Sequence, residues 1–197
     1  MSFNSVKKGK LFVVTGPSGV GKGTILSQFF KNNKDNICYS ISMTTRKPRP
    51  NEVDGVNYFF VTKEEFLESV EKDEFLEWAE YSGNYYGTNK SYVNKRLNMG
   101  LNVFLEIETK GASLVMEKFK DCVTVFFMPP NLDELEARLR GRHTEDEETI
   151  QKRLNAVKNE LAMAQNYKYV IINDKVDEAL DKLQKAFDFE TKEESNE

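Results

Sequence analysis

The feature that most constrains this chain is a glycine-rich loop set between an apolar run and a helical pattern. Residues 9–24 read GKLFVVTGPSGVGKGT, so the run LFVV leads directly into Gly16, and Lys22 opens the next segment. Glycines let backbone N–H groups turn inward, and the start of a helix adds the positive end of its dipole. With a lysine in register, the pattern predicts a cradle for the phosphates of a nucleotide. The alternative is a turn that only joins a strand to a helix.

The predicted nucleotide-binding loop departs from the usual pattern at one position. Its members are Gly16, Pro17, Ser18, Gly19, Val20, Gly21, Lys22, Gly23 and Thr24. Gly23 stands where a serine or threonine hydroxyl usually contacts Mg²⁺, and Thr24 is predicted to meet a phosphate oxygen instead. We therefore expect no direct protein ligand for the metal: ATP phosphates and water hold Mg²⁺, with Glu106 contributing through water. The alternative for Glu106 is a salt-bridged charge at a strand end.

Short apolar runs recur along the chain and alternate with helical patterns. The runs lie at 11–14, 102–107, 123–128 and 169–172, and the helical patterns lie at 25–31, 91–99, 110–119, 131–140, 147–165 and 176–187. Runs of this length, rich in Val, Ile and Phe, are typical of strands buried on both faces. The alternation predicts an α/β fold with a three-layer P-loop core, in which a mainly parallel sheet lies between helices. Gly100 and a capping box at Thr144-x-x-Glu147 mark helix ends.

Residues 42–90 interrupt this alternation. A loop rich in Pro and Gly leads into a strand, the capping box Thr62-x-x-Glu65 opens a short helix, and FLEWAEY and NYYGT have the composition of strands. The sequence therefore predicts one domain over 9–188, divided as core (about 9–41, 91–136 and 156–188), inserted α/β lobe (about 42–90) and helical lid (about 137–155). The acidic residues 189–197 are predicted to form a disordered tail.

The composition excludes several classes of protein. A net charge of −4 argues against a wide nucleic-acid surface, and the longest apolar runs are too short to span a membrane. No apolar run of signal-peptide length follows the N-terminus, so we expect a cytoplasmic protein. Cys38 and Cys122 fit small buried hydrophobic residues in a reducing compartment, with a single disulfide as the alternative.

Five segments, in order from about residue 9 to residue 188, resemble guanylate kinase, a nucleoside monophosphate kinase of the P-loop class. They are SISMTTRKPRPNEVDGVNYFF, FLEWAEYSGNYYGT, LEIETKGA, RLRGRHTEDEETIQKRL and VIIND. The resemblance implies transfer of the γ-phosphoryl group of ATP to GMP, and to dGMP, with Mg²⁺ accompanying ATP. It also implies small-molecule partners only, and a monomer or a homodimer.

The resemblance also assigns roles to residues at matching positions. Those implied to bind GMP are Ser42, Arg46, Arg49, Tyr58, Glu77, Tyr86, Thr88 and Glu108. Arg138 and Asn173 join the loop on the ATP side, and Lys22, Arg142 and Arg153 are implied to surround the transferred phosphoryl group. The chain differs from the common family pattern in the triplet Glu-Ile-Glu at 106–108 and in Lys110, where glutamine is frequent.

The residue types support several of these assignments on their own. Arg46 and Arg49 lie in a loop stiffened by prolines and can both bind one phosphate, whereas the alternative is a solvated basic loop. Alternation in FLEWAEY predicts that Glu77 shares a face with Phe75, Ala79 and Tyr81, which suits a buried carboxylate that accepts two donors from guanine. Its alternative is an ion pair with a lysine.

The arginines and the histidine near the predicted lid also have interpretations other than phosphate binding or catalysis. Arg138 and Arg142 share a helix face, where cations also offset the helix dipole. His143, the sole histidine, is interpreted as a solvated residue, because a monophosphate acceptor is already ionised at neutral pH and needs no general base.

Three other functions stay open at this point. A kinase for another monophosphate such as AMP would share the loop and the lid. A non-catalytic module that binds a phosphorylated peptide would be expected to lose the ATP loop and the lid arginines, both of which this chain keeps. A P-loop ATPase or GTPase switch is weakened by the lack of a guanine-reading N-K-x-D pattern.

Overall fold

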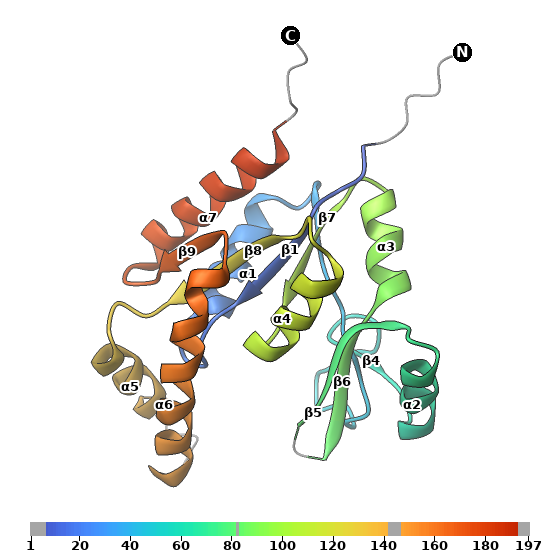
Figure 1. Ribbon diagram of the computed structural model, residues 1–197, viewed down its shortest axis with the longest axis horizontal. Coiled ribbons are helices and arrows are strands. Elements are labelled where there is room, and N and C mark those ends of the chain that lie inside the picture. Colours follow the sequence, from blue (N-terminus) through green and yellow to red (C-terminus); the bar gives the residue numbers. More distant parts are fainter. Residues whose placement is uncertain (1–6, 82, 142–146, 193–197) are drawn as a thin grey trace. The chain divides into compact units, whose positions relative to one another are not determined.

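The computed structural model describes residues 7–81, 83–141 and 147–192 (Figure 1). The chain divides into two compact units, each described by itself. The first comprises Met1–Phe12, Asn36–Glu106 and Lys110–Cys122, and the second comprises Val13–Asp35, Ile107–Thr109 and Val123–Glu197.

The first unit is built mainly around a small four-stranded sheet. Its elements are β2 (Ile37–Tyr39), β3 (Met43–Thr44), β4 (Phe59–Phe60), α2 (Lys63–Glu71), β5 (Phe75–Tyr81), β6 (Asn84–Asn89), α3 (Lys90–Asn98), β7 (Asn102–Glu106) and α4 (Thr109–Lys118). The sheet has the order β4-β3-β6-β5, with β6 antiparallel to both β3 and β5. Phe66 of α2 is fully buried and stacks on Phe75 and Tyr85, so this helix packs on the sheet through aromatic rings.

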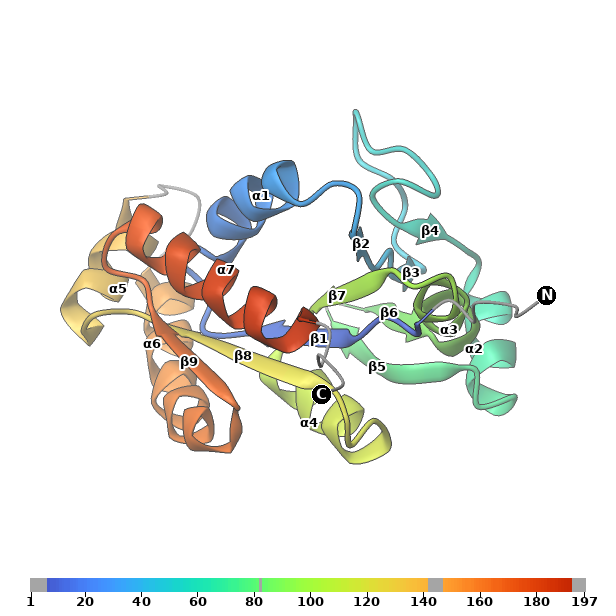
Figure 2. The same cartoon turned by 90° about the horizontal axis from the view of Figure 1, so that it is seen from above.

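The second unit carries the strand, loop and helix of the glycine-rich motif. Its elements are most of β1 (Leu11–Thr15), α1 (Lys22–Asn32), β8 (Val123–Met128), α5 (Leu132–Arg140), α6 (Glu147–Ala162), a 3₁₀ turn η1 (Met163–Asn166), β9 (Tyr169–Ile172) and α7 (Val176–Thr191). Helices α1 and α7 lie side by side in both views (Figures 1 and 2), and Phe29 meets Phe187 edge to face at 5.3 Å.

A five-stranded sheet has the order β2-β7-β1-β8-β9, and its pairings of β2 with β7 and of β8 with β9 are parallel. Side chains such as Val13, Val125 and Phe126 have no exposed surface, as strands covered on both faces require. The predicted α/β class with a mainly parallel sheet is confirmed. Among the described residues, no helix has both the length and the apolar character needed to cross a membrane.

Several predicted boundaries differ from the structure. Strand β2 was not among the four predicted, since its three residues carry no apolar run of strand length. The helix predicted over 147–165 ends at Ala162 and continues as a 3₁₀ turn. Helix α7 continues to Thr191, past the predicted end at 187, and near this end the buried carboxylate of Glu190 accepts a hydrogen bond from Tyr169 and pairs with Lys168.

Predictions made from local sequence signals agree with the structure where a side chain interacts directly with the backbone. The capping box of α2 is confirmed, because Thr62 accepts from the Glu65 N–H and Glu65 accepts from the Thr62 N–H. Gly100 follows the end of α3 with a φ of +83°. Cys38 and Cys122 are free thiols, but both are partly exposed rather than buried. Thr144 lies outside the described residues.

We predict that Thr62→Ala lowers the free energy of unfolding by about 1 kcal/mol, because the N–H of Glu65 loses its acceptor. Urea denaturation followed by circular dichroism measures the change. Ser69→Ala, which removes a hydroxyl from the interior of the same helix, is the matched control and should stay within about 0.5 kcal/mol of the parent. Equal effects of the two substitutions would contradict a capping role for Thr62.

Candidate functional site

The glycine-rich loop between β1 and α1 has a backbone that only glycine adopts readily. Gly16, Gly19 and Gly21 have φ values of +145°, +88° and +92°. A Cβ added at Gly16 would lie 2.3 Å from the carbonyl oxygen of Phe127, so this position also needs close approach of two backbones. Helix α1 begins at Lys22 with no side-chain cap on its N-cap residue Gly21. Its first N–H groups and its dipole therefore form a site suited to an anion.

Lys22 and Arg153 bring positive charge to this loop. The ammonium group of Lys22 donates to the carbonyl oxygens of Gly16 at 2.6 Å and of Pro17 at 3.2 Å. From α6, Arg153 Nη1 donates to the hydroxyl of Ser18 at 2.7 Å. The structure thus brings two of the three residues predicted to be catalytic to one loop, while the third, Arg142, lies outside the described residues.

A cavity of about 250 Å³ adjoins the loop within the same unit. Its lining includes Gly21, Thr24, Arg138 and Asn173, which are four of the predicted ATP-binding residues. Asn173 is buried and donates from Nδ2 to the carbonyl oxygen of Val20 at 2.7 Å, and Arg138 donates to the carbonyl oxygen of Asn173. Among the described residues, Oδ1 of Asn173 has no hydrogen-bond partner, so a buried acceptor is available for a donor on a ligand.

In the first unit, four residues predicted to bind phosphate are grouped around the loop before β4. The guanidinium of Arg46 lies 5.4 Å from the ring centre of Tyr58, whose ring meets that of Tyr86 at 6.1 Å. Tyr86 also interacts with this guanidinium, although the first cause that raises the pKa of Arg46 is its hydrogen bond to Glu52. Glu52 also accepts the backbone N–H of Arg49 at 2.7 Å. Sequence analysis missed Glu52, since the pattern did not show which carboxylate would pair with these arginines.

Glu77 and Thr88 form a buried polar pair between β5 and β6. Their exposed fractions are 8% and 1%, and the hydroxyl of Thr88 donates to Oε1 of Glu77 at 2.6 Å. The predicted alternation along β5 fails at its start: Phe75, Leu76 and Glu77 are buried in succession, whereas Ala79 and Tyr81 are exposed. A register shift between Phe75 and Glu77 accounts for the three consecutive buried residues, since an irregular pairing of this kind changes the side to which the following residues point. From Glu77 to Tyr81 the pairing with β6 is regular, so Ala79 and Tyr81 share a side with Glu77 but lie on the exposed part of the strand.

The other predicted residues are placed as follows. The carbonyl oxygen of Ser42, just before β3, accepts the N–H of Phe59. Glu106 ends β7 and accepts a hydrogen bond from the hydroxyl of Tyr39 at 3.2 Å. Glu108 belongs to the second unit, unlike the other residues predicted to bind GMP. Over the described ranges, no three acidic, His or Cys side chains are grouped as a metal site.

Glu160 of α6 is a further carboxylate that sequence analysis did not select. Burial raises the pKa of its carboxyl above the ordinary value, an effect that the nearby Lys22 opposes and Glu108 reinforces. Glu160 therefore lies close enough to Lys22 and Glu108 for their charges to affect the pKa of its carboxyl.

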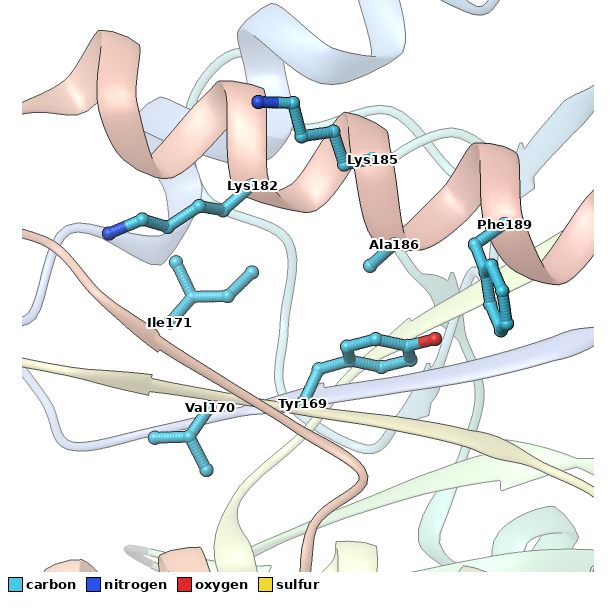
Figure 3. Close-up of a pocket in the computed structure, with 7 residues that line it drawn as sticks. All are labelled: Tyr169, Val170, Ile171, Lys182, Lys185, Ala186 and Phe189. Carbon is cyan, nitrogen blue, oxygen red and sulfur yellow. The ribbon is translucent and has the colours of Figure 1, made fainter.

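A larger groove of about 470 Å³ lies elsewhere in the second unit (Figure 3). Its walls come from β9 and α7, with Tyr169, Ile171 and Phe189 as apolar lining and Lys182 and Lys185 at its rim. None of the residues predicted from the sequence to bind a nucleotide lines it. Volume alone therefore does not identify the functional site.

Comparison with known proteins gives one consistent family. The family model described as Guanylate kinase matches residues 8–190. A guanylate kinase of Halalkalibacterium halodurans is 52% identical over 177 residues, which cover 90% of this chain and 86% of that protein. One of Streptococcus pneumoniae is 50% identical over 176 residues, or 89% of this chain and 85% of that protein. The crystal structure of guanylate kinase from Anaplasma phagocytophilum matches with a TM-score of 0.72 and 29% identity, covering 94% of this chain and 88% of that one.

We predict opposite effects for two glycines of the loop. Gly16→Ala should lower the free energy of unfolding by about 2 kcal/mol or more, because its φ is strained and its Cβ meets the carbonyl of Phe127. Gly23→Ala, the matched control, has no atom within 4 Å of the new Cβ and should raise that free energy by about 0.5 kcal/mol. Urea denaturation measures both. A neutral Gly16→Ala would show that the loop tolerates an ordinary backbone.

Proposed function

Because the chain belongs to the guanylate kinase family and is therefore a kinase, we propose that it transfers the γ-phosphoryl group of ATP to GMP, and to dGMP, giving ADP and GDP. The observation that carries the choice of acceptor is the buried carboxylate of Glu77, paired with Thr88. A charged group in such a place requires donors.

Guanine supplies donors that suit Glu77. Its N1–H and 2-amino group are adjacent, so one carboxylate can accept from both. Adenine presents a lone pair at N1 and has no 2-amino group, so it would face the carboxylate with repulsion. Ser42, Thr88 and Glu108 are the further residues that we assign to the base.

The monophosphate of the acceptor is assigned to Arg46, Arg49, Tyr58 and Tyr86. Two guanidinium groups and two phenol hydroxyls supply several donors to a dianion, and Arg binds phosphate in a fixed fork geometry. The grouping of Arg46 with both tyrosines supports this assignment. Because the second pKa of the phosphate is about 6, no proton has to be removed before transfer.

On the donor side, we assign the phosphates of ATP to the loop from Gly16 to Thr24 and the adenine to the cavity beside Asn173. The orphan acceptor Oδ1 of Asn173 fits the adenine amino group, and Arg138 lines the same cavity. Lys22 can exchange its carbonyl partners for phosphate oxygens. Arg142 and Arg153 are the remaining cations proposed to be catalytic.

Mg²⁺ is proposed to enter with ATP. Glu106 offers a strand-end carboxylate, which suits contact with the ion through water, and Thr24 offers a hydroxyl to a phosphate oxygen. When bound, the ion neutralises charge on the phosphates.

Catalysis by these residues consists of positioning and charge neutralisation. Phosphoryl transfer leaves a protein little covalent chemistry to perform. Two unit negative charges at 4 Å repel by about 4 kcal/mol at an effective dielectric near 20. Lys22 and the arginines are proposed to offset this repulsion.

The organisation of the chain follows from the same proposal. We assign GMP binding to a lobe at about 42–90, a closing lid to about 137–155, and the core to about 9–41, 91–136 and 156–188. We assign the chain to a monomer or a homodimer. The two free thiols fit a reducing cytoplasm.

The test is ADP release from ATP and Mg²⁺ with GMP, dGMP, AMP, CMP or UMP as acceptor. We expect turnover with GMP and dGMP, and a loss of about a hundredfold or more in Lys22→Met, which removes a charge that stabilises the transition state. Turnover with AMP but not GMP would contradict the proposed acceptor. No turnover with any acceptor would favour a non-catalytic binding module.

We predict that Glu77→Ala lowers kcat/KM for GMP by about a hundredfold, because the donors of guanine lose their acceptor. The KM for ATP should change little, and the preference for GMP over AMP should shrink. Glu80→Ala, an exposed carboxylate on the same strand, is the matched control. If Glu77→Ala keeps the full preference for GMP, the base is read by other residues, with Thr88 and Glu108 next to test.

A further inference from the structure

A tight turn places the carboxylate of Glu52 beside two arginines. The N–H of Glu52 donates to the carbonyl oxygen of Arg49 at 3.0 Å, which closes a four-residue turn. Pro50 occupies its second position, and Asn51 its third with a φ of +73°. These are the residue types and the backbone sign of a type II turn. The turn directs the chain back so that Glu52 Oε2 also accepts the N–H of Arg49 at 2.7 Å.

The same carboxylate binds Arg46 in a fork. Nη1 of Arg46 donates to Oε2 of Glu52 and Nη2 donates to Oε1, both at 2.9 Å. The two side chains are only 16% and 18% exposed. The Arg46 guanidinium lowers the pKa of the Glu52 carboxyl below its usual value, with the N–H of Arg49 as the next cause, so the pair is ionised at neutral pH.

The N–H groups of Arg46 that remain after binding Glu52 define the direction from which a ligand can bind. Nη1 also donates to the carbonyl oxygen of Lys47 at 2.8 Å, which uses its second N–H. A guanidinium has five N–H groups, and these three bonds leave Nε–H and one N–H of Nη2, with Tyr86 as a further neighbour of the guanidinium. Those two groups lie on one edge of the guanidinium plane, and two parallel N–H groups on one edge match two oxygens of a phosphate. The guanidinium is further held near the rings of Tyr58 and Phe60.

We propose that Glu52 is a positioning residue that holds Arg46 with its Nε–Nη2 edge presented to the phosphate of the acceptor nucleotide. The inference rests on the proposed function, since it takes that phosphate as the ligand of Arg46. Glu52 accepts from Nη1 and Nη2 of the guanidinium, and the turn fixes the position of Glu52, so Glu52 stays in place when phosphate binds. The rival role is an internal anion that competes with phosphate for Arg46, and it predicts the opposite sign for removal of the charge.

Glu52→Gln tests the two roles, because it replaces one acceptor oxygen by an amide donor that faces the donors of Arg46 and Arg49. We expect the KM for GMP to rise about tenfold, with a smaller change in kcat and little change in the KM for ATP. Glu52→Asp keeps the charge on a shorter side chain and should recover part of the loss. Glu64→Gln, an exposed carboxylate on α2 of the same unit, is the matched control and should behave as the parent.

A double-mutant comparison separates positioning from a general effect on the fold. If Glu52 acts through Arg46, Glu52→Gln should add little to the defect of Arg46→Ala. A KM for GMP that falls or stays unchanged in Glu52→Gln overturns the proposal. So does a full additional loss in the Arg46→Ala background, or a parallel rise in the KM for ATP. Should Glu52→Gln fail to fold by circular dichroism, Glu52→Asp is compared in the same way, and no effect on the KM for GMP there overturns the proposal.

Calorimetric titration with GMP keeps this test distinct from that of the transferase activity. If the parent chain turns over GMP and Glu52→Gln binds GMP as well as the parent, only the role of Glu52 is wrong. If the parent chain shows no transfer, the proposed function fails, and the titration still decides whether Glu52 supports binding of GMP. Absence of GMP binding by the parent overturns both.

Discussion

Grouped cations repel one another, and both candidate nucleotide sites depend on acceptors within the protein that hold these cations in place. In the second unit, the carbonyl oxygens of the loop accept from Lys22, and the hydroxyl of Ser18 accepts from Arg153. In the first unit, the carboxylate of Glu52 accepts from Arg46. A bidentate ion pair is stronger than a hydrogen bond to a neutral acceptor and fixes a plane. The first unit thus holds Arg46 through an ion pair, whereas in the second unit loop carbonyl oxygens accept from Lys22 and the Glu160 carboxyl lies near it.

The backbone of the loop imposes a second constraint, because the amide groups that suit an anion are available only in a conformation that other residues resist. Gly16 is limited by the carbonyl of Phe127, Gly19 by the side chain of Leu139 and Gly21 by the amide of Asn173. Each contact comes from a segment distant in sequence. The tight packing of β8, α5 and the residue after β9 around the loop therefore leaves glycine as the residue that fits, while Gly23 faces open space.

Features determined by short-range chemistry were predictable from the sequence. The loop after β1, the capping box at Thr62 and the four strands with apolar runs depend on neighbours in the chain, and the structure has each of them. Family membership followed from motifs spread over both units. Strand β2 was not counted among the main predicted strands, because its place in the sheet comes from pairing with β7 and not from its own three residues. The consecutive burial of Phe75, Leu76 and Glu77 was not predicted, because the register shift before Glu77 depends on pairing with β6. Glu52 was missed because six acidic residues lie within the predicted lobe before Asp73, and only the folded turn decides which one meets Arg46.

Glu52 and Glu77 show how one side-chain type takes two roles within a single unit. Glu52 is bound by a permanent cation and a backbone N–H, so its charge is satisfied inside the protein and it serves to orient its partner. Glu77 is more deeply buried and accepts a hydrogen bond from the neutral hydroxyl of Thr88. Under the proposed function, the donors of guanine would join the hydroxyl of Thr88 at this carboxylate. Under the same proposal, affinity for phosphate comes from the arginines, which bind any anion, while selection of the base comes from Glu77, because an unsuitable base does not offer the donors of guanine.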